Sequence, residues 1–186
     1  DDRRRHGNVR KTAHARAGTI GGWLEMTPLD VLNDLRAFLA DKMTAYSGRT
    51  VDGKAIKCFT GFLPRAMTPE AKEKLCPAVV VGYSGVADRA DESVVSVVIS
   101  VVTRGPDMIH GADELFHMLE YIRFCLLDAN PACDKYDVKN GTMETSVPDD
   151  QPYPQWWGRI DFEVHIPQPS GIDPFLLGGP EHGRHN

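Results

Sequence analysis

The sequence predicts an α+β domain in which a mainly antiparallel or mixed β-sheet is flanked by two long α-helices. Three observations lead to this prediction: a β-branched run at 93–103, a strictly alternating run at 156–166, and two amphipathic periods at 28–43 and 111–127. β-Branched side chains favour strands, whereas apolar residues spaced by three and four favour helices. We expect a single domain with flexible terminal tails.

The run at 93–103, SVVSVVISVVT, is the predicted central strand because it is too short to span a membrane and too β-branched for a soluble helix. One face is wholly apolar and consists of Val95, Val97, Ile99 and Val101. The other face alternates valine with serine, in the order Val94, Ser96, Val98, Ser100 and Val102. A mixed face of this kind suits a surface that another sheet or subunit covers better than one in open water.

The bulk composition is that of an ordinary globular protein. With 41% hydrophobic and 25% charged residues among 186, the chain falls outside the fibrous and wholly disordered classes. No apolar run approaches the roughly 20 residues of a membrane span, and the first residues lack a hydrophobic signal core. We therefore expect no membrane partner and a protein that is soluble and not secreted by this route.

Charge and periodicity divide the chain into a basic arm at 1–25, a domain at 26–168 and a tail at 169–186. Residues 1–25 hold six Lys and Arg against three Asp and Glu, while the remainder holds 15 against 23. The net charge of -5 argues against general nucleic-acid binding. A solvated extension is the favoured interpretation of the arm, and an arm that binds nucleic acid or a partner is the alternative. The Gly- and Pro-rich tail is expected to be flexible.

The first helix is predicted over 28–43 from its start signal and its stripe. Thr27 can cap the helix, Pro28 is tolerated in the first turn, and Asp30 suits the positive end of the helix dipole. The apolar stripe consists of Val31, Leu32, Leu35, Phe38, Leu39 and Met43. We expect this stripe to pack on the sheet, and the chain to enter a loop or hairpin over 46–53.

Between the first helix and the central strand, the sequence predicts a short strand over 56–63, a short helix over 69–75 and a buried strand over 78–83. Thr68 and Pro69 mark the start of the short helix, and Pro77 marks its end. The link at 84–92 is of a size that can join antiparallel neighbours. The strand at 78–83 is thus expected beside the central strand.

After the central strand, a second long helix is predicted over 111–127. Its stripe consists of Leu115, Met118, Leu119, Ile122 and Leu126. Asn140 and Gly141 then form a favoured hairpin dipeptide, which predicts a pair of short strands within 136–147. In the last strand, 156–166, the residues expected to point inward are Ile160, Phe162, Val164 and Ile166, and those expected to face water are Arg159, Asp161, Glu163 and His165.

The titratable residues predict no catalytic, cofactor-binding or metal site. His110 and His117 lie near Asp113 and Glu114, but the histidines stand seven positions apart, unlike an i, i+4 chelating pair. A solvated helix face is the favoured interpretation. The four cysteines show no CxxC pair and are expected to be reduced, and the sequence contains no phosphate loop, nucleophile elbow or HExxH.

The adjacent tryptophans Trp156 and Trp157 point to an interface, because neighbouring strand residues face opposite ways. The outward-facing one is a candidate anchor for a partner. Together with the second face of the central strand and the polar face of the last strand, they form the candidate interface: Trp156, Trp157, Val94, Val98, Val102, Arg159 and Glu163.

The order of these elements resembles the tail-terminator, or tail-completion, proteins of long-tailed bacteriophages and related prophages. The matching pieces are the strand CPAVVV at 76–81, the strand at 94–103, the helix at 111–127, and PYP at 152–154 leading to WGRIDF at 157–162. The resemblance covers about residues 28–168 and consists of loose patterns.

The resemblance implies a mixed α/β subunit that forms a hexameric ring on the head-proximal end of the tail tube. Such a protein stops tube growth, offers a docking surface to the head, and has no catalytic residues or cofactor. The implied partners are other copies of the chain, the tail tube protein and a head-completion or neck protein, with DNA only nearby in the tail lumen. The implied location is the virion, and the host cytoplasm during assembly. The alternatives are another neck or minor tail protein with the same subunit fold, and a small metal-dependent hydrolase that uses His110 and His117.

Overall fold

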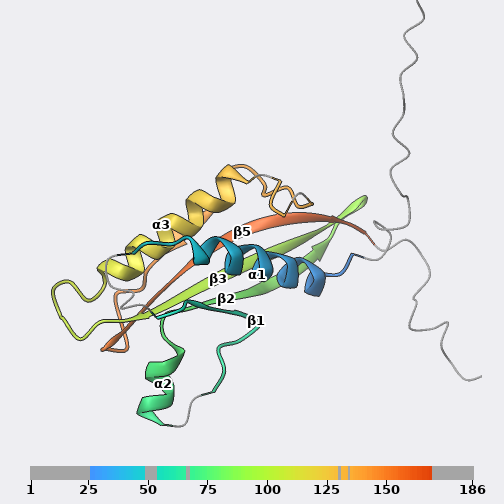
Figure 1. The fold of residues 1–186 in the computed structure, drawn as a ribbon. Helices are drawn as coiled ribbons and strands as arrows, with labels where there is room; N and C mark the ends of the chain where they lie inside the picture. The colour runs from blue at the N-terminus through green and yellow to red at the C-terminus, as the bar shows by residue number, and fades with distance from the viewer. Residues whose placement is uncertain (1–25, 49–53, 66–67, 130, 134, 169–186) are drawn as a thin grey trace, which may run out of the picture.

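In the part of the chain that it describes, the computed structural model shows an α+β fold with a five-stranded mixed sheet and three helices (Figure 1). It describes residues 26–48, 54–65, 68–129, 131–133 and 135–168, so the predicted arm and tail lie outside the described residues. Its elements are α1 (Pro28–Thr44), β1 (Lys57–Thr60), α2 (Pro69–Leu75), β2 (Ala78–Asp88), β3 (Glu92–Arg104), α3 (Asp113–Asp128), β4 (Glu144–Ser146) and β5 (Gln155–Pro167). Within the described ranges, no helix is both long and apolar enough to cross a bilayer.

The strand order is β1-β2-β3-β5-β4, which places the predicted central strand β3 in the middle of the sheet. β1 pairs with β2 in parallel, and all other neighbouring pairs are antiparallel. β3 pairs along its whole length with β5, from Glu92 opposite Pro167 to Arg104 opposite Gln155. The prediction that the preceding strand is an antiparallel neighbour of β3 is confirmed.

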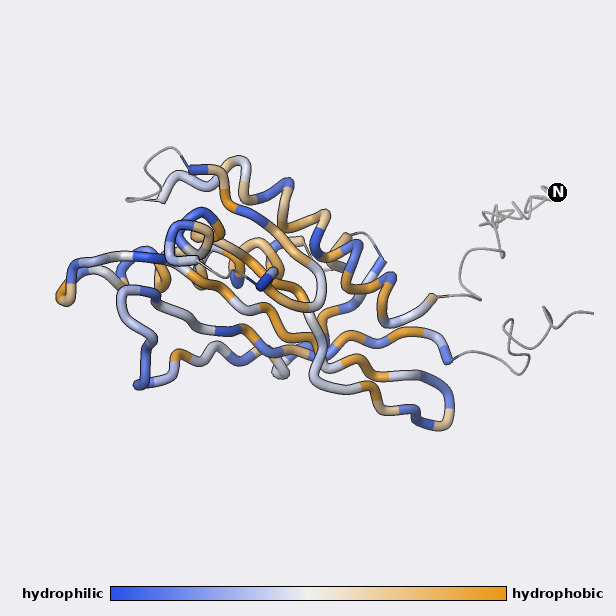
Figure 2. Tube along the Cα trace, turned by 90° about the horizontal axis from the view of Figure 1, so that it is seen from below, coloured by the Kyte–Doolittle hydropathy of each residue, from blue (hydrophilic) through white to orange (hydrophobic). Residues whose placement is uncertain are grey.

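Both α1 and α3 pack on the same face of the sheet, and Figure 2 shows α1 running along one side of the strands. The apolar face of β3 and the alternate residues of β5 meet the two helix stripes there. The strand residues in this core are Val79, Val81, Val95, Val97, Ile99, Val101, Ile160, Phe162, Val164 and Ile166. Each of these side chains is at most 3% exposed, so the layer between the sheet and the two helices is the hydrophobic core of the domain.

The first helix begins where its sequence predicts. Thr27 is the N-cap, and its hydroxyl accepts a hydrogen bond from the Asp30 backbone N–H while the Asp30 carboxylate accepts one from the Thr27 backbone N–H. This capping box satisfies two backbone donors that a helix start otherwise leaves without partners. The Thr27 hydroxyl, at 2.6 Å, and the Thr27 backbone N–H both donate hydrogen bonds to the Asp30 carboxylate and hold its pKa below its usual value.

The predicted pair of long helices is incomplete, because the described residues form three helices. The third, α2, is the seven-residue helix that Thr68 and Pro69 predict, and it lies beside the β1 edge, away from α1 and α3 (Figure 1). β2 also runs farther than the predicted 78–83, to Asp88. A bulge between Tyr83 and Gly85 lets the strand continue past the turn-rich sequence that predicted a loop.

The hairpin predicted within 136–147 is wrong in its pairing. Gly141 does adopt the left-handed backbone, with φ of 80°, that makes this dipeptide a turn signal. The two flanking segments, however, do not pair with each other: Val138 bridges Val164, and β4 pairs with β5 farther along the same edge. The turn at Gly141 therefore lies between two short segments that both pair with the same edge of β5.

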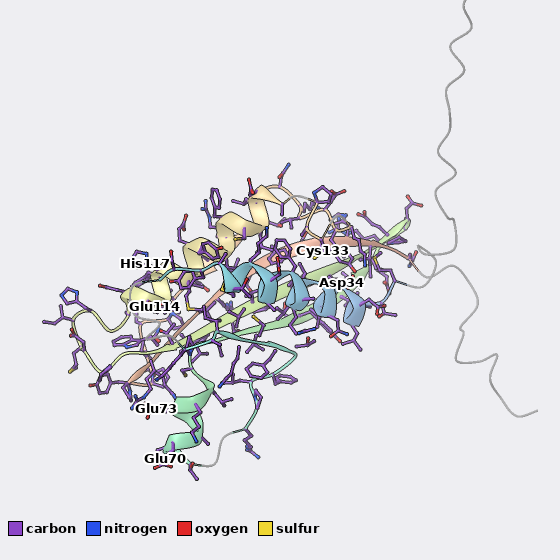
Figure 3. All side chains as sticks on the ribbon, in the orientation of Figure 1. Asp34, Glu70, Glu73, Glu114, His117 and Cys133 are labelled. Carbon is purple, nitrogen blue, oxygen red and sulfur yellow. The ribbon has the colours of Figure 1, made fainter. Side chains whose placement is uncertain are left out.

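Hydrogen bonds from Lys135 and Tyr136 connect the chain segment after α3 to helix α1. The Asp34 carboxylate on α1 accepts hydrogen bonds at 2.8 Å from both Lys135 Nζ and Tyr136 Oη. The Lys135 hydrogen bond holds the pKa of Asp34 below its usual value, against the opposing effect of burial. Burial and the Asp34 hydrogen bond together raise the pKa of the Tyr136 phenol. Figure 3 shows Asp34 on the helix that faces this segment.

The substitution Val97→Asp should abolish folding, whereas Val98→Asp, one residue along the same strand, should leave the free chain folded. Val97 is 1% exposed in the core, where an unpaired carboxylate costs several kcal/mol. Val98 points to the opposite face and is only half-buried. Circular dichroism and thermal unfolding of the two variants test this, and a cooperative Val97→Asp transition at the wild-type temperature would contradict the assignment of faces.

The substitution Asp34→Ala should lower the free energy of unfolding by about 1 kcal/mol at pH 7, because the buried Tyr136 hydroxyl loses its acceptor. Since the folded pKa of Asp34 is depressed, its stabilisation is present above the unfolded pKa of about 3.9 and is lost as pH falls through the folded pKa. Urea unfolding should therefore show a constant difference between the two proteins from pH 7 to about pH 4, and a difference that shrinks as the pH falls further. Asp41→Ala, at an exposed position of α1, is the matched control, and an equal loss there would contradict this role for Asp34.

Candidate interface on the open face of the sheet

The face of the sheet opposite α1 and α3, here called the open face, is where the predicted interface residues gather. Side chains of β3 and β5 alternate across the sheet, so the residues that flank the core positions point to this face. On β3 they are Ser96, Val98, Ser100 and Val102, and on β5 they are Trp157, Arg159, Asp161, Glu163 and His165. Most are half-buried, in contrast to the fully buried residues beneath the helices.

The strand register arranges the open face as an apolar end and a charged end. At the apolar end Val102 lies opposite Trp157, and Ala78 of β2 lies on the other side of Val102. Toward the other end Val98 lies opposite Asp161, and Ser96 lies opposite Glu163. An apolar patch with a polar surround is the usual composition of a protein–protein contact.

The charged groups of the open face are paired within the chain. Arg159 Nε lies 2.9 Å from Asp161 Oδ2, and Lys139 Nζ lies 3.7 Å from Glu163 Oε2. His165 Nδ1 lies 2.6 Å from Glu92 Oε2. The open face therefore carries positive and negative groups together and has no concentration of positive charge. Binding to nucleic acid requires such a concentration, so this composition favours a protein partner.

The structure identifies Trp157 as the tryptophan on the open face. Its neighbour Trp156 lies on the helix side, where its Nε1 donates a hydrogen bond of 2.9 Å to the Gly105 carbonyl and its ring packs edge to face with Tyr153. The Trp157 backbone is fixed from both sides by Gln151, whose carbonyl accepts from the Trp157 N–H at 2.7 Å and whose amide donates to the Trp157 carbonyl at 3.0 Å. Trp157 is thus held in a set position on a half-buried surface.

The predicted interface set divides into two parts. The open face brings together Val98, Val102, Trp157, Arg159 and Glu163. The other two differ from the expectation: Trp156 is turned to the helix side, and Val94 is 2% exposed, between His165 and Ala87 in the register. Alternation alone placed Val94 on the correct face, but it could not show that neighbours on the sheet already bury it.

Sequence reasoning missed exposed apolar residues outside the sheet. The loop between β3 and α3 projects beyond the body of the domain (Figure 1) and has a hydrophobic tip in Figure 2. In this loop Met108 is 77% and Ile109 is 82% exposed. On α3 itself Phe116, Phe124 and Leu127 are about half exposed. The helical period could have predicted the exposure of these three residues, because they lie away from the apolar stripe that faces the core.

The histidines and acidic residues of α3 do not form a compact group. His110 Nδ1 lies 3.4 Å from Asp113 Oδ2, in an ion pair whose side chains are both well exposed. Glu114 is buried, whereas His117, labelled with it in Figure 3, lines a surface hollow with Tyr46 and Phe124. Among the described residues, no group of three or more His, Cys, Asp or Glu side chains is placed to hold a metal ion.

In the described part of the chain, none of the four cysteines forms a disulfide. Cys76 and Cys125 are buried, and Cys58 and Cys133 are partly buried. Burial raises the pKa of the Cys58 and Cys76 thiols, which lowers the fraction present as the nucleophilic thiolate at neutral pH. Their environment is that of core residues.

Comparison with protein-family models and with curated proteins gives no match to this chain.

Proposed function

We propose that this chain is a structural subunit of a phage tail, and specifically a tail terminator that caps the head-proximal end of the tail tube as a hexameric ring. The observation that carries the proposal is the open face, where Val98, Val102 and Trp157 lie in a sheet that the chain's own long helices leave uncovered. Contact with a neighbouring copy or with the tail tube would bury these side chains.

The open face leaves apolar side chains partly exposed, and their burial would stabilise a contact. Each large apolar side chain moved from water into a contact contributes about 1.5–3 kcal/mol when it is fully buried. Gln151 already fixes the Trp157 backbone, so little backbone entropy is lost when a partner covers the half-buried side chain. A tryptophan in the apolar part of a mixed surface has the character of a binding hot spot.

The order of elements supplies the second support, because it follows the pattern on which the resemblance to tail terminators rests. The short strand β1, the short helix α2, the paired strands β2 and β3, the helix α3 and the final strand β5 occur in that sequence. The partners proposed on this basis are other copies of the chain, the tail tube protein and a neck protein. The proposed place of action is the virion tail.

Replacing Trp157 with Glu should leave the free chain folded but give tail tubes that overrun their normal length and fail to join heads. The charge would enter the apolar end of the proposed contact, where its desolvation opposes assembly. Leu29→Glu places the same charge on an exposed position of α1 and should assemble normally. Electron microscopy of particles made with each variant gives the readout. Tails of normal length joined to filled heads in the Trp157→Glu preparation would contradict the terminator proposal.

A further inference from the structure

The outer side of α3 is unusually apolar for a helix that faces solvent. Phe116 is 53% exposed, Phe124 63% and Leu127 48%, although the opposite side of the helix already supplies the core stripe. A helix on the surface of a domain normally turns polar residues outward, and one that is apolar on both sides is normally covered on both. The outer side of α3 therefore has the composition of a contact surface.

The residues on this side follow the spacing of a helix–helix seam. Phe116, Glu120, Arg123 and Leu127 are separated by steps of four, three and four, which is the spacing that keeps residues on one seam between paired helices. Phe124 flanks this row. We call these five residues the α3 seam.

The α3 seam is complementary to itself when two copies run antiparallel. In that arrangement Phe116 of one copy lies opposite Leu127 of the other, and Glu120 lies opposite Arg123, because the steps read the same from either end. Two apolar pairs then flank two pairs of opposite charge. A two-fold contact requires this kind of self-complementary surface.

We propose that two copies of this chain associate through the α3 seam as an antiparallel, two-fold dimer. In the single chain Arg123 Nη1 lies 2.8 Å from Glu120 Oε1, so both charged groups are already oriented on this surface. In the dimer each of them faces the opposite charge of the partner copy, which fixes the register of the helices.

The exposed area fits a modest but specific association. At about 150–250 Å² for a large aromatic side chain, the exposed parts of the two phenylalanines and the leucine amount to roughly 300 Å² of apolar surface per copy. A surface hollow of about 460 Å³, lined by Glu120, Tyr121 and Phe124 of α3 with Tyr46, adjoins the seam and provides room for side chains of the second copy. The whole contact is at the lower end of specific interfaces, so we expect micromolar affinity.

The dimer is independent of the proposed tail function. The α3 seam is in the helix layer, and the open face is on the opposite side of the sheet. The two contacts therefore use different residues. A failure of one does not predict a failure of the other.

Charge reversal tests the dimer directly through sedimentation equilibrium of the full chain. Glu120→Arg should weaken self-association at least tenfold, since each of its two charged contacts becomes Arg opposite Arg, and Arg123→Glu should do the same with Glu opposite Glu. An equimolar mixture of the two variants should restore a dimer, because only the mixed pair has opposite charges at both contacts. The double variant Glu120→Arg, Arg123→Glu should associate like the wild type.

Phe116→Asp should also be monomeric, and circular dichroism should show it folded because the side chain is half exposed in the free chain. Asp149→Arg, at an exposed position before β5, is the control for a change of net charge and should leave association unchanged. A wild-type chain that stays monomeric up to about 0.5 mM would overturn the proposal. So would single reversals that associate like the wild type, or a mixture of them that does not recover the dimer.

Discussion

The structure depends on the burial of one face of β3 beneath α1 and α3. β3 is the only described strand with two long neighbours, and its face carrying Val95, Val97, Ile99 and Val101 lies at the centre of the hydrophobic core. Removing these side chains from water provides most of the driving force that brings the two helices onto the sheet. The capping box of α1 and the Asp34 contact set where the first helix lies once that packing exists.

Covering one face with both long helices leaves the other face of the sheet only partly covered, with Val98, Val102 and Trp157 half-buried but Ala78 and Val94 buried. On that face the chain places Trp157 and two valines among paired charges, which avoids a large continuous apolar surface while keeping an apolar end. The outer side of α3 is a second surface of mixed character, in the helix layer on the other side of the sheet. A chain with two such surfaces is suited to assembly, because one contact does not occupy the other.

Local patterns predicted most of the elements, and long-range pairing explains where they failed. The periods of β3, β5, α1 and α3, and the start signals at Thr27 and Thr68, are visible within a few residues of each element. The wrong hairpin at 136–147 arose because the Asn-Gly turn signal is local, whereas the partner strand β5 is distant in sequence. Alternation likewise assigned Trp157, Val98 and Val102 to one face, but neither the burial of Val94 nor the orientation of Trp156 toward Gly105 has a local signal.

The accessibility of Ser100, at the middle of the open face, tests most directly whether this face becomes a subunit contact. With Ser100→Cys, mass spectrometry would follow maleimide labelling of the peptide that contains position 100, in the free chain and in assembled tails. A cysteine at the exposed position 149 would report any general change in reactivity. We predict rapid labelling at position 100 in the free chain and strong protection in tails, with position 149 equally reactive in both. Equal labelling of position 100 in the two states would contradict the assignment of the open face as the contact.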